Sequence, residues 1–188
     1  MSIALASDLI NGKSVAVVGN GIKILQRNDG LWIDEHDVVI RFNFEFPIPS
    51  RSKNIGNRTD IMICARGLLK RVYTNKLRWD SICRRNYNTY IVGRHPTKFL
   101  KYHLPSNSLK ECQNLISKQP TTGAITVHSL MTFFNPVSCT VFGFDGQKSG
   151  TLSENAFPKK RQGRLHRPKR EQAWLESIKD KITVVEYQ

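Results

Sequence analysis

Short apolar segments recur along this chain, and helical or loop stretches separate them. Two of these stretches, Thr122–Phe134 and Lys169–Asp180, are helical in pattern. Strands that alternate with helices predict an α/β fold with a mostly parallel sheet flanked by helices. Such sheets bind ligands at the carboxyl ends of their strands. The predicted strands are Val15–Val18, Val38–Phe42, Asp60–Cys64, Tyr90–Val92, Thr140–Phe144 and Ile182–Glu186.

The length of the chain and the absence of a repeat or linker predict one domain over residues 1–188. The chain contains 29 Lys and Arg against 15 Asp and Glu, a formal net charge of +14. This charge attracts anionic partners such as nucleic acid, an anionic membrane surface, nucleotides or acidic sugars. The charge alone does not indicate which of these partners binds. No apolar run reaches the roughly 20 residues of a membrane span, and the amino-terminal sequence lacks the basic region of a secretory signal.

The first predicted strand runs directly into Gly19-Asn20-Gly21. Glycines in such a turn allow positive φ angles and the close approach of a ligand to the backbone. A short helix after the turn would direct free N–H groups at an anion. The segment therefore predicts a phosphate site, although its spacing is not that of the dinucleotide fingerprint and a purely structural turn remains the alternative. Gly143 follows a later strand and is expected at the same edge of the sheet.

A second candidate anion site lies at Thr121, Thr122 and Gly123. Either threonine can cap the helix that follows, and the glycine leaves the first helical turn accessible. A plain helix cap without a ligand is the alternative interpretation. Further along this helix, His128 lies near the apolar face and is expected to be a core residue.

The sequence HRPKRE, residues 166–171, combines a candidate base with an acid. Histidine is the side chain most easily poised as a base near neutral pH, which makes His166 a catalytic candidate. Pro168 suits the first turn of a helix, and Glu171 would lie in that turn, where the helix dipole favours a carboxylate. A solvated loop histidine and an ordinary helix-start acid are the alternatives.

The remaining candidates are an asparagine and a possible metal cluster. Asn43 stands near the end of a strand, where its amide could bind a base or a sugar hydroxyl. Three acids flank His36, but they precede a strand without a second ligand cluster, so we expect no metal. We also expect free thiols in a reducing cytosol, because no C-x-x-C pair occurs among Cys64, Cys83, Cys112 and Cys139.

Together these segments resemble the sialyltransferases of glycosyltransferase family 29. VAVVGNG, IDEHDVVIRFN and IGNRTDI are similar to the large sialyl motif of that family. PTTGAITVHSLMTFFNPVSCTVFGFDG is similar to the small motif, and HRPKRE to the very small motif. The three motifs occur in the family's order between residues 13 and 171.

The resemblance implies a single-domain variant of the GT-A fold with a Rossmann-like sheet, a CMP-activated sugar as donor, and inverting transfer without a cofactor or metal. By this resemblance Asn20 and Asn43 match nucleotide-binding asparagines, and the turn at 19–21 holds CMP. The turn at 121–123 holds the cytidine, phosphate or carboxylate of the donor. His166 matches the general base, and Glu171 is its companion in the motif.

The sequence also departs from the family pattern. The region between the small and very small motifs lacks the family's histidine, so Lys159, Lys160 or Arg164 would have to neutralise the phosphate. The cysteines that join the large and small motifs in animal enzymes are absent, as are the anchor and stem. We therefore expect a short bacterial or viral member that acts in the cytoplasm on a glycan or glycolipid, with possible peripheral contact with an anionic membrane.

Three other functions remain open from the sequence. A Kdo transferase would use CMP-Kdo, because Kdo, like sialic acid, is a 2-keto acid. A degenerate member would bind CMP without transferring a sugar. A nucleic-acid-binding protein could use the basic run PKKRQGRLHRPKR within the predicted long loop Gln147–Arg170, but this run has no aromatic residues for base stacking, so we expect no nucleic acid partner.

Overall fold

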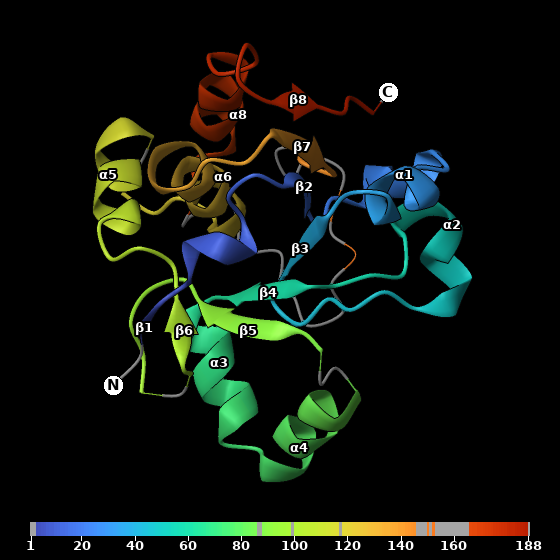
Figure 1. Cartoon of the computed structure of the whole chain (residues 1–188), viewed down its shortest axis with the longest axis vertical. Coiled ribbons are helices and arrows are strands. Elements are labelled where there is room, and N and C mark those ends of the chain that lie inside the picture. Colours follow the sequence, from blue (N-terminus) through green and yellow to red (C-terminus); the bar gives the residue numbers. More distant parts are fainter. Residues whose placement is uncertain are drawn as a thin grey trace.

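The computed structural model describes residues 3–85, 88–98, 100–116, 118–145, 150, 152 and 166–187. The strands of these segments form one sheet in the order β1-β6-β5-β4-β3-β2-β7-β8, and each neighbouring pair is parallel. Figure 1 shows the amino terminus beside β1 and the carboxyl terminus beyond β8, at opposite edges of the sheet. The strands are β1 (Ile3–Ala4), β2 (Ser14–Val18), β3 (Val38–Phe42), β4 (Ile61–Cys64), β5 (Tyr90–Gly93), β6 (Tyr102–His103), β7 (Ser138–Phe142) and β8 (Thr183–Val184).

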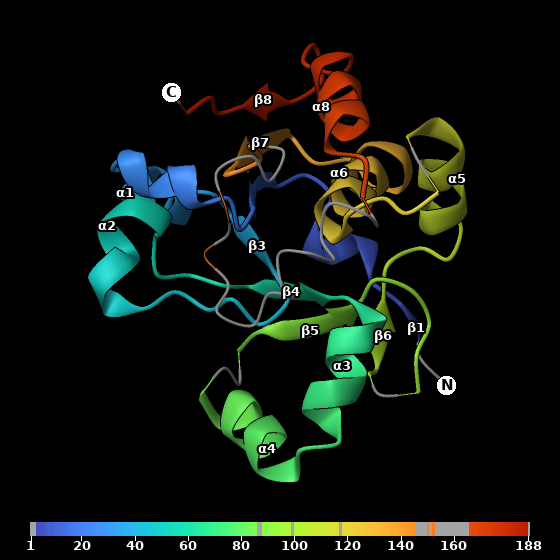
Figure 2. The ribbon, with the colours of Figure 1, turned by 180° about the vertical axis from the view of Figure 1, so that it is seen from behind.

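Helices cover both faces of the sheet, which is why its central strands are apolar throughout. Figures 1 and 2 show α5, α6 and α8 grouped on one side of β2 and β7, α1 and α2 together beyond β3, and α3 and α4 below β5. The α-helices are α1 (Gly30–Asp34), α2 (Ser52–Ile55), α3 (Arg66–Tyr73), α4 (Lys76–Arg85), α5 (Ser108–Leu115), α6 (Thr122–Phe133) and α8 (Pro168–Glu176), and the 3-10 turns are η1 (Ser7–Leu9), η2 (Ile22–Gln26) and η3 (Pro49–Arg51).

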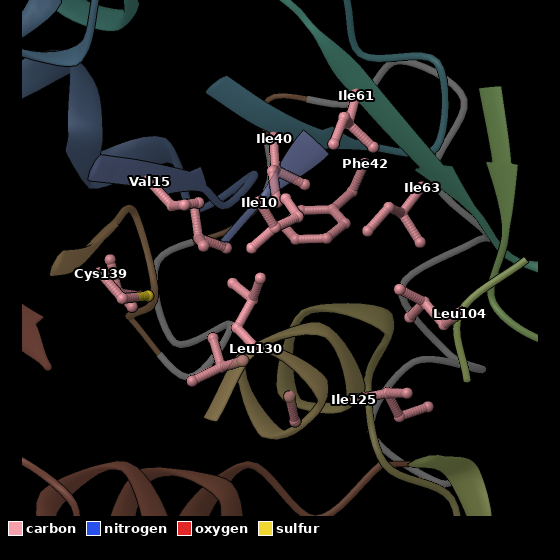
Figure 3. Packing of buried hydrophobic residues seen from close by; sticks show 14 of the residues in the cluster. Ile10, Val15, Ile40, Phe42, Ile61, Ile63, Leu104, Ile125, Leu130 and Cys139 are labelled. Atoms are coloured by element: carbon pink, nitrogen blue, oxygen red, sulfur yellow. The ribbon is translucent and has the colours of Figure 1, made fainter. Parts of the chain in front are cut away.

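The main core lies between the sheet and α6. Val15 and Val17 of β2 point into this core, whereas the alternate residues Ala16 and Val18 pack on the opposite face, as the period of a strand requires. Figure 3 shows side chains of β3 and β4 above Leu130 and Ile125 of α6. Every residue from 122 to 130 is buried, so α6 is enclosed on all sides rather than amphipathic.

The predicted α/β fold with a parallel sheet is confirmed, as are the six predicted strands and the two predicted helices, with shifts at their ends. The sequence analysis missed β1 and β6, which contain only two residues each. Most of the predicted loop 147–170, including Lys159, Lys160 and Arg164, lies outside the described residues. No helix in the described segments is long and apolar enough to cross a membrane.

The cysteines fit the expectation of unpaired thiols. Cys64, Cys112 and Cys139 are free and buried, while the side chain of Cys83 lies outside the described residues. His128 is also buried, as predicted, with its Nε2 3.8 Å from Glu111 of α5.

Candidate active site

The turn after β2 differs from its prediction. Gly19, Asn20 and Gly21 do not adopt positive φ angles, and the short helix that follows is the 3-10 turn η2. The glycines are needed for packing instead, because a Cβ on either residue would stand 2.6 Å from the backbone oxygen of Gly143. The turn at 143–145 therefore fills the space beside the bare backbone. Asn20 is half-buried, and its backbone oxygen accepts a hydrogen bond from Leu152 N.

Gly143 is the glycine of this region that needs left-handed backbone. Its φ is +67°, and a Cβ there would lie 2.9 Å from the oxygen of Gly19. Gly19 N donates to Phe142 O at 2.7 Å and Gly21 N donates to Gly143 O at 3.1 Å, so the ends of β2 and β7 are joined directly.

The ring of Phe144 connects this turn to the start of α6. A Cβ on Gly19 would lie 2.7 Å from Phe144 Cδ2, and a Cβ on Gly123 would lie 2.6 Å from Phe144 Cζ. Gly123 is therefore needed to make room for this ring, and its role in leaving the first helical turn accessible to a ligand stays a prediction. Phe144 also meets the Phe42 ring edge-on at 6.2 Å. The sequence analysis did not assign Phe144 a role, although this residue lies within the segment that resembles the small motif.

Asn43 follows β3 in a strained conformation. Asn43 has a φ of +59° and Phe44 a φ of +62°, two consecutive left-handed residues that are not glycine. The side-chain Oδ1 of Asn43 accepts a hydrogen bond from Ala65 N at 3.0 Å. This bond orients the amide, and its nitrogen is then the end available to a ligand. Because β2 and β3 are neighbours in the sheet, Asn20 and Asn43 lie at adjacent strand ends.

The beginnings of α6 and α8 are joined through Thr121 and Glu171. The Glu171 carboxylate accepts hydrogen bonds from Thr121 N at 2.8 Å and from Thr121 Oγ1 at 2.7 Å. Thr121 is the N-cap of α6, and its Oγ1 accepts from Ala124 N at 3.1 Å. Thr122 is buried next to this cap. One threonine therefore caps its own helix and binds an acid that lies 50 residues later in the chain.

His166 lies immediately before α8 and contacts the loop that enters α6. Its Nδ1 is 2.9 Å from Gln119 O. A carbonyl oxygen can only accept, so Nδ1 carries the proton and donates it to this bond. In the neutral ring the lone pair is then on Nε2, the arrangement that a general base requires.

Glu171 is 8% exposed, and this burial raises the pKa of its carboxyl. The hydrogen bonds from Thr121 and the nearby His166 act in the opposite direction and lower the same pKa. Pro168 occupies the first turn of α8 with Glu171, as predicted. The structure thus brings Thr121, Glu171 and His166 together from two distant segments.

Two of the acids around His36, Asp34 and Asp37, accept hydrogen bonds from the protein itself. The Asp34 carboxylate accepts from Asn57 N at 2.7 Å and from Arg58 N at 3.0 Å. The Arg58 guanidinium in turn donates to the backbone oxygens of residues 34, 36 and 37. These bonds join the segments IDEHDVVIRFN and IGNRTDI. Among the described residues, no group of three or more His, Cys, Asp or Glu side chains could hold a metal.

The sequence matches the family model of glycosyltransferase family 29 (sialyltransferase) over residues 10–136. A comparison with curated proteins finds no match. A solved mammalian sialyltransferase is similar to this chain with a TM-score of 0.63 and 19% identity, covering 98% of this chain and 72% of that one.

Two further solved structures are similar in fold. A mammalian sialyltransferase in complex with Gal-beta-1-3GalNAc-ortho-nitrophenol gives a TM-score of 0.61 at 20% identity, covering 98% of this chain and 73% of that one. A form of the sialyltransferase CST-II in complex with CMP gives 0.56 at 16% identity, covering 92% and 80%. At these identities the likeness concerns the fold.

Proposed function

The chain belongs to glycosyltransferase family 29, the sialyltransferases, and we propose that it transfers sialic acid from CMP-sialic acid to a hydroxyl group of a glycan, with inversion at the reacting carbon and without a metal. Membership of the family makes it a CMP-sugar-dependent glycosyltransferase. We propose the identity of the sugar, the class of acceptor and the chemical roles of the residues. The observation that carries these roles is the bond between His166 and Gln119 O, which leaves Nε2 of His166 able to accept a proton.

In the proposed reaction, Nε2 of His166 removes the proton of the acceptor hydroxyl. The acceptor oxygen then forms a bond to the anomeric carbon of the donor, and the bond from that carbon to the phosphate oxygen breaks. CMP leaves with the electron pair. The backbone carbonyl of Gln119 binds the Nδ1 proton and thereby stabilises the imidazolium that forms. A positioned base of this kind contributes about 10²–10⁴-fold to the rate.

The donor would bind at the carboxyl ends of β2, β3 and β7. Asn20 and the amide nitrogen of Asn43 would bind the nucleotide. The N-terminus of α6 would direct the N–H groups of Thr122 and Gly123 and the helix dipole at the anionic part of the donor, next to Thr121, whose own N–H is bound by Glu171. The turns at 19–21 and 143 would form the floor of this region. Glu171 acts through Thr121 and positions both helix starts rather than reacting with the substrate.

The free buried thiols of Cys64, Cys112 and Cys139 support action in a reducing compartment, which we propose to be the cytoplasm. Among the described helices none could anchor such an enzyme by spanning a membrane. We propose that any contact with an anionic membrane is made through the basic charge of the chain.

The experiment measures CMP release from CMP-sialic acid and from CMP-Kdo, in the presence of a chelator, for the natural protein and for His166→Ala. We expect release from CMP-sialic acid, reduced about 10²–10⁴-fold in the variant. Gln113→Ala is a matched control, because it removes a similar hydrogen bond, from Gln113 Nε2 to Lys118 O at 2.9 Å, beside the same loop. This control is expected to remain active.

Each other outcome contradicts a defined part of the proposal. Full activity in His166→Ala would refute the role as base, and release from CMP-Kdo alone would change the sugar. CMP binding without release, in the presence of a range of galactoside acceptors, would identify a degenerate member. Activity that disappears with the chelator and returns with a divalent cation would refute the metal-independent mechanism.

A further inference from the structure

A second group of polar residues lies at the carboxyl ends of β4, β5 and β6, outside the proposed donor contacts. Arg66 is the first residue of α3 after β4, Arg94 and His95 follow β5, and His103 ends β6. The strand register places Cys64 opposite Gly93 and Gly93 opposite His103, so these residues come from adjacent strand ends. All four side chains are cationic or can become cationic.

Arg94 is half-buried, and one nitrogen of its guanidinium makes no hydrogen bond. Its Nε is buried without a hydrogen-bond partner, whereas about nine in ten buried polar groups in proteins have one. Burial lowers the pKa of Arg94, but a guanidinium remains charged at neutral pH. Within the described segments, no Asp or Glu forms an ion pair with Arg94 or Arg66. Among the described residues, these two arginines therefore have no carboxylate partner at ion-pair distance.

The two histidines of this group each have one ring nitrogen already bound. His95 Nδ1 donates to Pro96 O at 3.4 Å, and His103 Nδ1 donates to Leu104 O at 2.6 Å. Their Nε2 atoms are the ends that can serve a ligand. Burial lowers the pKa of His95, and the positive neighbours Arg94, Arg66 and His103 lower it further. The positive charges of these neighbours therefore act on His95, and the strand register places the backbones of residues 93 and 103 side by side.

The group borders the proposed active site through α5. Cys112 of α5 is buried, and its pKa is raised to about 12 by burial and by Glu171, while Arg94 lowers it. The thiol thus lies within the electrostatic influence of both Arg94 and Glu171. On the other side, the bond between Asn43 Oδ1 and Ala65 N joins the donor region to the residue that precedes Arg66.

We propose that Arg66, Arg94, His95 and His103 form a subsite for an anionic group (a carboxylate, sulfate or phosphate) on the glycan acceptor. The proposal rests on the proposed function, since it names the class of acceptor that the transferase uses. Adjacent strands are about 4.8 Å apart, so β5 lies roughly 10 Å from β3 on the side away from β7. This offset fits a group on the acceptor better than the phosphate of a donor that binds at β2, β3 and β7.

The test compares two acceptors that differ in one charge: Gal-beta-1-3GalNAc-ortho-nitrophenol and the same compound with a sulfate on one galactose hydroxyl. The readout is the ratio of kcat/KM for the sulfated compound to kcat/KM for the neutral one. We expect a ratio of about ten or more for the natural protein and a fall of about tenfold or more in Arg94→Gln. Arg66→Gln, which alters an exposed side chain of the same group, should lower the ratio in the same direction and guards against misfolding of the first variant.

Lys110→Gln is the control, because it removes one positive charge from an exposed position on α5 and should change the ratio less than twofold. A ratio near one in the natural protein would overturn the subsite. So would a rise in the KM for CMP-sialic acid, with an unchanged ratio, in the arginine variants, because the group would then bind the donor.

A separate binding measurement distinguishes failure of the subsite from failure of the transferase function. Calorimetric titration with the sulfated and neutral compounds requires no donor and no turnover. Preferential binding of the sulfated compound that Arg94→Gln abolishes would support the subsite even in a protein that transfers no sugar. Equal and weak binding of both compounds by an active transferase would refute the subsite alone.

Discussion

Replacing Glu171 with alanine removes the two hydrogen bonds that join the beginnings of α6 and α8. Thr121 N and Thr121 Oγ1 would lose acceptors at 2.8 Å and 2.7 Å, inside a region where Glu171 is only 8% exposed. A hydrogen bond to a charged group contributes about 1.5–3 kcal/mol, and the desolvation of the carboxylate offsets part of the pair. We therefore expect Glu171→Ala to lower the free energy of unfolding by about 2–4 kcal/mol.

For a chain of this size the loss corresponds to a fall in Tm of roughly 5–15 °C, which thermal unfolding followed by circular dichroism would detect. Glu176→Ala is the matched control, because Glu176 lies on the same helix with its side chain 63% exposed and pairs with Lys179 at 2.8 Å. An exposed pair contributes about 0–1 kcal/mol, so this variant should unfold within about 3 °C of the natural protein.

A double-mutant cycle identifies the bond itself. Thr121→Val removes the hydroxyl contact and leaves the backbone N–H of residue 121 in place. Combined with Glu171→Ala, it should show a coupling energy of about 1 kcal/mol or more. Unfolding of Glu171→Ala within about 2 °C of the natural protein, or additive effects in the cycle, would refute the inference that this contact holds the two helix starts together.

Two further predictions concern stability. Because burial raises the pKa of Glu171 in the folded state, the protonated carboxyl adds stability beyond that of its hydrogen bonds; this added stability is present below the ordinary pKa of 4.5 and is lost as the pH rises through the folded pKa. The natural protein should therefore lose stability relative to Glu171→Gln as the pH rises from about 4.5 toward 7, and a constant difference in urea unfolding over this range would contradict the assignment. Gly143→Ala should destabilise by about 1–3 kcal/mol, since its φ is +67° and a Cβ would meet Gly19 O at 2.9 Å. Gly67→Ala in α3 meets nothing within 4 Å and should instead stabilise by about 0.5–1 kcal/mol; equal effects of the two substitutions in chemical denaturation would contradict the glycine argument.

The strands of the central sheet could be predicted from sequence because they are buried on both faces and so read as continuous apolar runs. The two-residue strands β1, at the edge of the sheet, and β6, between β1 and β5, could not be predicted, because two residues show no period and take their conformation from the strands they pair with. α6 was found from its apolar content, although it is buried on every side rather than on one.

The sequence was sufficient to identify the residues of the candidate site, but not to predict the contacts between them. His166 and Glu171 were visible as a base and an acid on one segment, but no local pattern places Glu171 against Thr121, 50 residues earlier. The packing role of the glycines could not be predicted for the same reason. The ring of Phe144 lies against Gly19 and Gly123, and only the folded chain brings these backbones together. Arg94 and His95 carried a weak signal, two cationic residues directly after a buried strand.

The order of the strands has a consequence for folding during synthesis on the ribosome. β2 lies between β3 and β7, and Ser14 pairs with Ser138, so one side of this central strand has no partner until 124 further residues have been made. At about 5–20 residues per second, that wait is on the order of 6–25 s. During this time the apolar strand β2 presents an open hydrogen-bonding edge, to which other nascent chains or a chaperone can bind. The strand that ends in the proposed donor-binding turn is therefore open to mispairing before synthesis is complete.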